Sequence, residues 1–131
     1  MKNLLIVTAI MEAGVGLALL FAPSLVTRLL FAADITGAAV PLGRITGVLL
    51  LALSAACWLA RGDAGSRAGG ALLTEALIYD VGVTGISVIL VIQSQDVGIL
   101  LWPVIIIHVA MAVWCVAILR RMPAPPFGSF R

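Results

Sequence analysis

The sequence predicts an all-α membrane protein built as a bundle of four transmembrane helices. Of its 131 residues, 63% are hydrophobic and only 11% are charged, and the mean hydropathy is +1.21. A soluble domain has about 45–50% apolar and about 25% charged residues. The chain therefore has too little polar surface to coat a soluble globule, and the same composition excludes a disordered chain.

Four apolar stretches account for most of the chain. A helix that crosses the bilayer needs about 20 mostly apolar residues. The stretches that satisfy this are Leu4–Ala22, Val40–Ala60, Gly70–Ile92 and Val97–Leu119. Backbone groups in lipid must be hydrogen-bonded within the spanning structure, which leaves helices or a closed barrel. The run over 48–53 does not alternate as a barrel strand would, so we expect one four-helix membrane domain over 1–121.

The basic residues predict the orientation of the bundle. Short loops rich in Lys and Arg lie on the cytoplasmic side of a membrane. If the four helices alternate in direction, one side receives Lys2, Arg61, Arg67, Arg120, Arg121 and Arg131. The other side keeps Arg28, offset by Asp34, and Asp96. Both termini are therefore expected in the cytoplasm.

Two segments outside the spans have their own patterns. The first outer loop, residues 23–39, is too long for a tight turn, and Leu25, Leu29 and Leu30 recur in it at helical spacing. This pattern predicts a short amphipathic helix on the outer membrane surface. Residues 122–131 contain three prolines, which a continuing helix does not tolerate. We expect this segment to be an extended cytoplasmic tail.

Glycine and proline positions predict how the helices pack and bend. Close approach of membrane helices is predicted by the Gly43-xxx-Gly47 spacing in the second span, by the Gly14-xxx-Ala18-xxx-Ala22 spacing in the first, and by Gly82 and Gly85 in the third. Pro103 lies inside the fourth predicted span, where it would remove a backbone hydrogen bond. It therefore predicts a kink in that helix.

A short sequence pattern occurs in both halves of the chain. Residues 10–15 read Ile-Met-Glu-Ala-Gly-Val, and residues 78–83 read Ile-Tyr-Asp-Val-Gly-Val. Each has a carboxylate, one spacer and Gly-Val near mid-span. Duplicated hairpins in parallel orientation would give this pattern. Chance similarity within the small alphabet of membrane helices would also give it, and both explanations stay open here.

The polar residues inside the spans are the candidate site. A charge at mid-bilayer costs roughly 2.5–3.5 kcal/mol even on the mildest insertion scale, so such groups face the bundle interior and find partners. The candidate ligand- or proton-binding residues are Glu12, Arg44, Glu75, Tyr79, Asp80 and His108. The helical rise of about 1.5 Å per residue places Glu12, Asp80 and His108 at similar depth near the midplane.

The roles of these residues leave alternatives open. Arg44 lies near the start of the second span, from which its long side chain can reach inward to Glu12 or Asp80 or extend outward to the headgroups. Glu75 lies nearer the cytoplasm and shares a helix face with Tyr79. The groups can pair and hold the helices together, form a polar site or proton path, or contact another subunit.

Other kinds of site have little support in the sequence. Zinc needs three or four ligands and heme a suitable axial set, whereas the chain has one histidine. No metal site and no catalytic residue is predicted, and no cofactor is indicated. Phosphate-binding glycine loops and serine-nucleophile motifs do not occur. The net charge of +2 follows the orientation bias and does not indicate nucleic-acid binding.

Several motifs carry a resemblance to a broader group of proteins. They are Glu12-Ala13-Gly14-Val15-Gly16, Ala22-Pro23-Ser24, Gly43-Arg44-Ile45-Thr46-Gly47, Glu75-Ala76-Leu77-Ile78-Tyr79-Asp80, and Trp102-Pro103 with His108. In these the chain resembles small bacterial four-helix integral membrane proteins that have no established activity. The resemblance implies a multi-pass protein of the bacterial inner membrane and transfers no function.

Three functions are compatible with these observations. The first is binding or transport of a small ligand, cation or proton, which a homo-oligomer would assist because four helices do not enclose a wide pore. The second is an accessory or assembly subunit of a larger membrane complex. The third is a membrane-embedded enzyme acting on a lipid or quinone, with Glu75, Tyr79, Asp80 and His108 as acids and bases. The expected partners are the bilayer and either further copies of this chain or a larger membrane protein.

Overall fold

The computed structural model describes residues 1–94 and 96–121, and these form an all-helical structure. Its α-helices are α1 (Lys2–Phe21), α2 (Pro23–Phe31), α3 (Ala39–Ala60), α4 (Arg67–Gln93) and α5 (Leu101–Leu119), with a 3₁₀ turn, η1, at Arg61–Asp63. Four of these helices are long and apolar enough to cross a membrane. The prediction of four spanning helices is confirmed, and the chain is a multi-pass membrane protein. The predicted tail over 122–131 lies outside the described residues.

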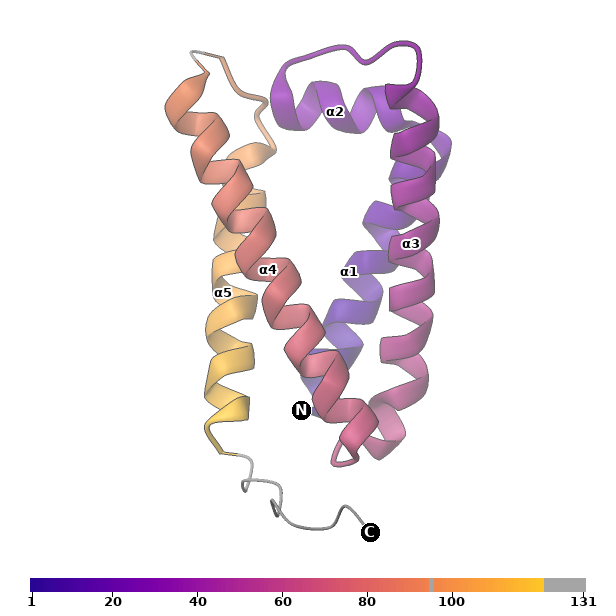
Figure 1. Cartoon of the computed structure of the whole chain (residues 1–131), viewed down its shortest axis with the longest axis vertical. Coiled ribbons are helices and arrows are strands. Elements are labelled where there is room, and N and C mark those ends of the chain that lie inside the picture. The colour runs from indigo at the N-terminus through magenta and orange to yellow at the C-terminus, as the bar shows by residue number, and fades with distance from the viewer. Residues whose placement is uncertain (95, 122–131) are drawn as a thin grey trace, which may run out of the picture.

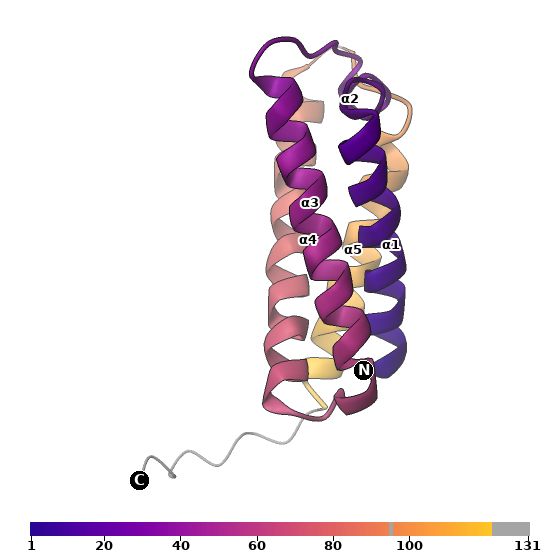
Figure 2. The ribbon, with the colours of Figure 1, turned by 90° about the vertical axis from the view of Figure 1, so that its right-hand side faces the viewer.

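The long helices form two antiparallel hairpins, α1 with α3 and α4 with α5 (Figure 1). The start of α1 and the end of α5 lie at one end of the bundle, which we call the N-terminal end. The hairpins approach each other there and separate toward the opposite end, which α2 crosses; we call this the α2 end. In the view turned by 90°, all the long helices extend along the length of the molecule, and α3 is inclined to α1 (Figure 2).

The first hairpin is held by direct contact between two helix backbones. A Cβ atom added to Gly47 would lie 2.6 Å from the carbonyl oxygen of Gly16. In addition, the Ser54 hydroxyl donates a hydrogen bond of 2.7 Å to the Ala9 carbonyl. Gly47 was predicted to allow this approach. The prediction was wrong for Gly14, Gly82 and Gly85, because nothing lies within 4 Å of a Cβ added at any of them, and in the first span Gly16 makes the contact instead.

Two apolar clusters join the hairpins in the half of the bundle near the N-terminal end. The first has the buried residues Leu4, Leu73, Ala76, Met111 and Cys115. The second has Leu5, Ala9 and Cys57, with partly buried residues that include Leu72 of α4. Helix α1 contributes to both clusters. Helix α3 joins it in the second cluster through Cys57, so both helices of the first hairpin contact the second hairpin.

At the α2 end the hairpins are joined through backbone hydrogen bonds. The Gly98 N–H donates to the Leu30 carbonyl and the Leu100 N–H to the Leu29 carbonyl, each at 3.0 Å. The contact needs glycine, since a Cβ at Gly98 would clash with the Leu29 carbonyl. Helix α2 thus connects the first hairpin to the segment that precedes α5.

The kink predicted at Pro103 was wrong. Helix α5 begins at Leu101, four residues later than the expected start at Val97. Pro103 therefore lies in the first helical turn, where the N–H that proline lacks would have no intrahelical partner.

Candidate functional site

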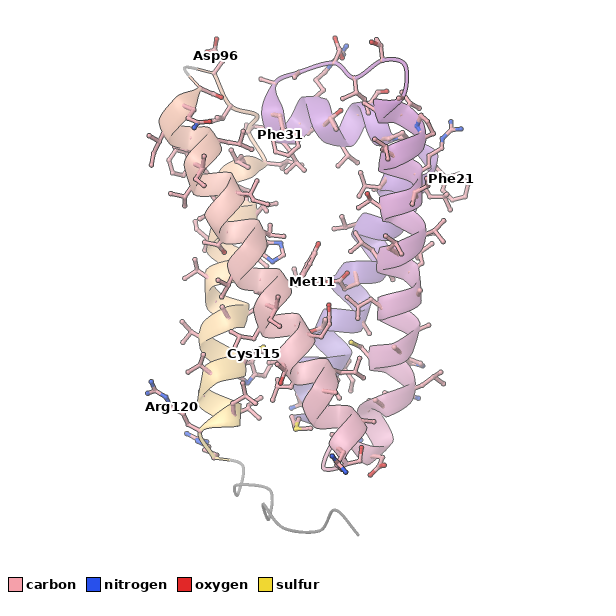
Figure 3. The ribbon with its side chains drawn as sticks, in the orientation of Figure 1. Met11, Phe21, Phe31, Asp96, Cys115 and Arg120 are labelled. Atoms are coloured by element: carbon pink, nitrogen blue, oxygen red, sulfur yellow. The ribbon has the colours of Figure 1, made fainter. Side chains whose placement is uncertain are left out.

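A small polar cavity lies between the two hairpins, close to the middle of the spans. Its volume is about 20 Å³, which is enough for one water molecule or an ion of similar size. Met11 marks its position on the side of α1 that faces the second hairpin (Figure 3). The lining residues of this central cavity are Thr8, Met11, Glu12, Ala76, Tyr79, Asp80, His108 and Met111.

An acid–histidine pair forms the wall contributed by the second hairpin. The Nδ1–H of His108 on α5 donates a hydrogen bond of 2.7 Å to Oδ1 of Asp80 on α4. Asp80 is only 5% exposed. The Tyr79 ring packs edge-on against the His108 ring, with 5.5 Å between their centroids. This hydrogen bond gives both side chains a partner and links α4 to α5 beside the cavity.

The wall contributed by α1 contains two polar side chains that each have a buried oxygen atom without a hydrogen-bond partner among the described residues. Thr8 and Glu12 are 5% and 6% exposed and lie one helical turn apart on the same face. Oγ1 of Thr8 and Oε2 of Glu12 have no hydrogen-bond partner within the described residues. A buried polar atom without a partner costs about 1–3 kcal/mol. The unsatisfied atoms of the cavity are therefore concentrated on α1.

Glu75 belongs to a second feature, an open groove along α4. This lateral groove has a volume of about 570 Å³ and is lined by Ala71, Thr74, Glu75, Ile78 and Tyr79. Oε2 of Glu75 is buried and lacks a hydrogen-bond partner in the part of the chain that the structure describes. Tyr79 lines both the groove and the cavity. The four groups of the enzyme hypothesis are thus divided, with Glu75 in the groove and Asp80 and His108 in the cavity.

Arg44 is not brought to the cluster. Its side chain is exposed, and within residues 1–94 and 96–121 it forms no ion pair with Glu12, Asp80 or any other carboxylate. The reason is its angular position on α3. Gly43 and Gly47 face Pro23 and Gly16, and a helix turns by about 100° per residue, so Arg44 lies beside the face that contacts the first helix and not on it.

The sequence interpretation did not include Thr8 among the candidates. Its position four residues before Glu12 was a usable signal, since residues at this spacing share a helix face. The structure also brings together Glu12 and Asp80, the two carboxylates of the repeated pattern, as lining residues of one cavity. Among the described residues there is no group of three or more His, Cys, Asp or Glu side chains arranged to hold a metal ion.

Comparison of the chain with protein-family models, curated proteins and solved structures finds no match. The class of the protein is therefore defined by its own fold and site. It is a multi-pass membrane protein of four long apolar helices with a buried acid–histidine cluster between its two hairpins.

Proposed function

We propose that the protein binds a proton or a small cation in the central cavity and moves it across the membrane. The observation that carries this proposal is the charge balance of the cavity. Glu12, Asp80 and His108 come from three different helices, and no Lys or Arg is among the residues that line the cavity. Asp80 has a hydrogen-bond partner in His108. Glu12 has no such partner in the described part of the chain.

This imbalance favours a binding site over a purely structural contact. If the polar groups served only to hold the helices together, each would be expected to have a partner, because a buried charge near mid-bilayer is costly. Glu12 instead requires a positive charge that the lining residues do not provide. A proton or a small cation supplies that charge, and either fits a cavity of about 20 Å³.

The distribution of basic residues supports an orientation with the N-terminal end in the cytoplasm. Residues at this end, from α1, η1, α4 and the segment after α5, include Lys2, Arg61, Arg67, Arg120 and Arg121 (Figure 1). Under the positive-inside rule this end is cytoplasmic, and α2 lies at the outer surface. Together with the resemblance to bacterial proteins, this supports a location in the bacterial inner membrane.

Reconstitution into liposomes tests the proposal. Proton flux under an imposed membrane potential is followed with an internal pH dye, and cation flux with radioactive tracers. We expect flux through the wild-type protein that is lost in Glu12→Gln and in Asp80→Asn. The matched control is Asp96→Asn, which makes the same acid-to-amide change at an exposed position outside the spans.

The outcomes separate the candidate functions. Loss of flux in well-folded Glu12 and Asp80 variants, with flux retained in Asp96→Asn, supports the proposal. Unfolding of both site variants would assign the cluster a structural role. A wild-type protein without proton or cation flux, recovered by native mass spectrometry in fixed stoichiometry with a larger membrane protein, would instead identify an accessory subunit.

A further inference from the structure

We propose that Thr8 and Glu12 form the coordinating pair for one small alkali cation, with sodium as its test ion. This inference rests on the proposed function and names its ligand. Both side chains are more than nine-tenths buried, and both line the central cavity. Each has an oxygen atom without a hydrogen-bond partner in the described residues.

Of the threonines in the described helices, Thr8 and Thr84 have a buried hydroxyl oxygen without a hydrogen-bond partner, and of these two only Thr8 lines the central cavity. Thr27, Thr46 and Thr74 each donate their hydroxyl to the carbonyl oxygen four residues earlier, at 3.0 or 3.1 Å. This is the ordinary way for a threonine in a membrane helix to satisfy its hydroxyl. The Thr8 hydroxyl makes no such bond. Its oxygen is therefore available for a ligand in the cavity.

The chemistry of the available atoms favours a hard monovalent cation. A hydroxyl and a carboxylate offer oxygen ligands, which suit hard cations rather than the softer transition metals. The described residues hold no set of three acidic, histidine or cysteine ligands for a divalent metal. Asp80 has His108 as a hydrogen-bond partner, so Glu12 is the carboxylate of the cavity that is left for an ion, and one carboxylate balances a single positive charge.

The volume of the cavity also favours a small monovalent cation. Its volume of about 20 Å³ holds one particle of the size of a water molecule. A dehydrated sodium ion fits such a space, whereas organic cations such as choline do not. The carboxylate of Asp80 and the side chain of Tyr79 also line this space, so the ion would lie between the two hairpins.

The first measurement is the binding of radioactive sodium to the wild-type protein in lipid nanodiscs. We expect saturable binding of one ion per chain, displaced by unlabelled sodium and not by choline. In parallel, the unfolding temperature is measured at fixed pH as sodium replaces choline at constant ionic strength. An ion that binds only the folded state raises this temperature in proportion to the logarithm of its concentration above the dissociation constant.

Conservative variants test whether Thr8 and Glu12 are the two ligands of the sodium ion. We expect Glu12→Gln to abolish the sodium effect and Thr8→Val to require at least about tenfold more sodium for the same shift, as the loss of one ligand predicts. Thr8→Ser keeps a hydroxyl and should retain the effect. The matched control is Thr46→Val, whose hydroxyl is already bonded to the Leu42 carbonyl on an exposed face of α3.

Each result decides between the two proposals. A wild-type protein that binds no sodium overturns the inference whether or not the variants fold. If proton flux through the liposomes is nevertheless lost in Glu12→Gln, the proposed function stands and the ligand is a proton. If Thr8→Val binds sodium as tightly as the wild type, Thr8 is not a ligand. Absence of both sodium binding and ion or proton flux overturns the proposed function as well.

Discussion

The two hairpins of this protein are held together by different kinds of contact. In the first hairpin, Gly16 and Gly47 bring the α1 and α3 backbones into direct contact. In the second, Asp80 and His108 link α4 and α5 through a hydrogen bond between side chains that can change charge. Glycines are present there too, but nothing lies within 4 Å of a Cβ added at Gly82 or Gly85. The comparison shows that the first hairpin is packed through close approach of its backbones, whereas a polar side-chain pair contributes to the packing of the second.

The largest expected effect comes from breaking the backbone contact of the first hairpin. In Gly47→Ala the new Cβ would lie 2.6 Å from the Gly16 carbonyl oxygen, so the helices must separate. We expect the free energy of unfolding to fall by roughly 1–3 kcal/mol, the usual cost of overpacking. Reversible unfolding in mixed micelles measures it. The matched control is Gly82→Ala, which should lose no stability; equal losses in the two variants would show that the hairpins do not differ as described.

The next effect concerns the link between the hairpins at the α2 end. Gly98→Ala places a Cβ against the Leu29 carbonyl and should break the bonds that Gly98 and Leu100 donate to α2. Because a backbone hydrogen bond contributes about 0.5–1.5 kcal/mol, we expect local opening to become easier by about 1 kcal/mol or more. Hydrogen exchange at the Leu100 amide measures this opening, with Gly85→Ala as the control. Unchanged protection of Leu100 would contradict the contact.

A smaller effect is expected for the polar pair of the second hairpin. A double-mutant cycle with Asp80→Ala and His108→Ala isolates their coupling energy. Interhelical hydrogen bonds in membrane proteins average about 0.6 kcal/mol and reach about 1.7 kcal/mol in such cycles, and we expect a value in this range. A coupling energy near zero would mean that α4 and α5 are held by their apolar contacts alone.

The smallest effect is expected at Arg44. Arg44→Gln removes a charge that is exposed and unpaired within the described residues, so the free energy of unfolding should change by no more than about 0.5 kcal/mol. The same unfolding assay measures it. A loss well above this value, removed when Glu12→Gln is present in the same chain, would show that Arg44 reaches the cavity and balances Glu12.

The predicted and observed helices differ most at the start of the fourth span. The spans were located to within a few residues, except that the fourth was started at Val97 rather than Leu101. That error also caused the wrong kink at Pro103. Apolar residues in the connecting loop, such as Val97 and Ile99, have the same hydropathy as residues of the helix. The loop backbone is instead fixed by the bonds between Gly98, Leu100 and α2, which link segments far apart in the chain.

The order of residues along the chain was sufficient to predict four membrane helices and to place Glu12, Asp80 and His108 at similar depth. Hydropathy and helical rise are properties of the chain along its own length, so they can be evaluated without knowledge of neighbouring helices. The packing of the helices set the rest: Thr8 lines the cavity, Glu75 lines the lateral groove and Arg44 is exposed. These outcomes depend on how each helix is rotated about its axis, and that rotation is set by the packing of side chains between helices.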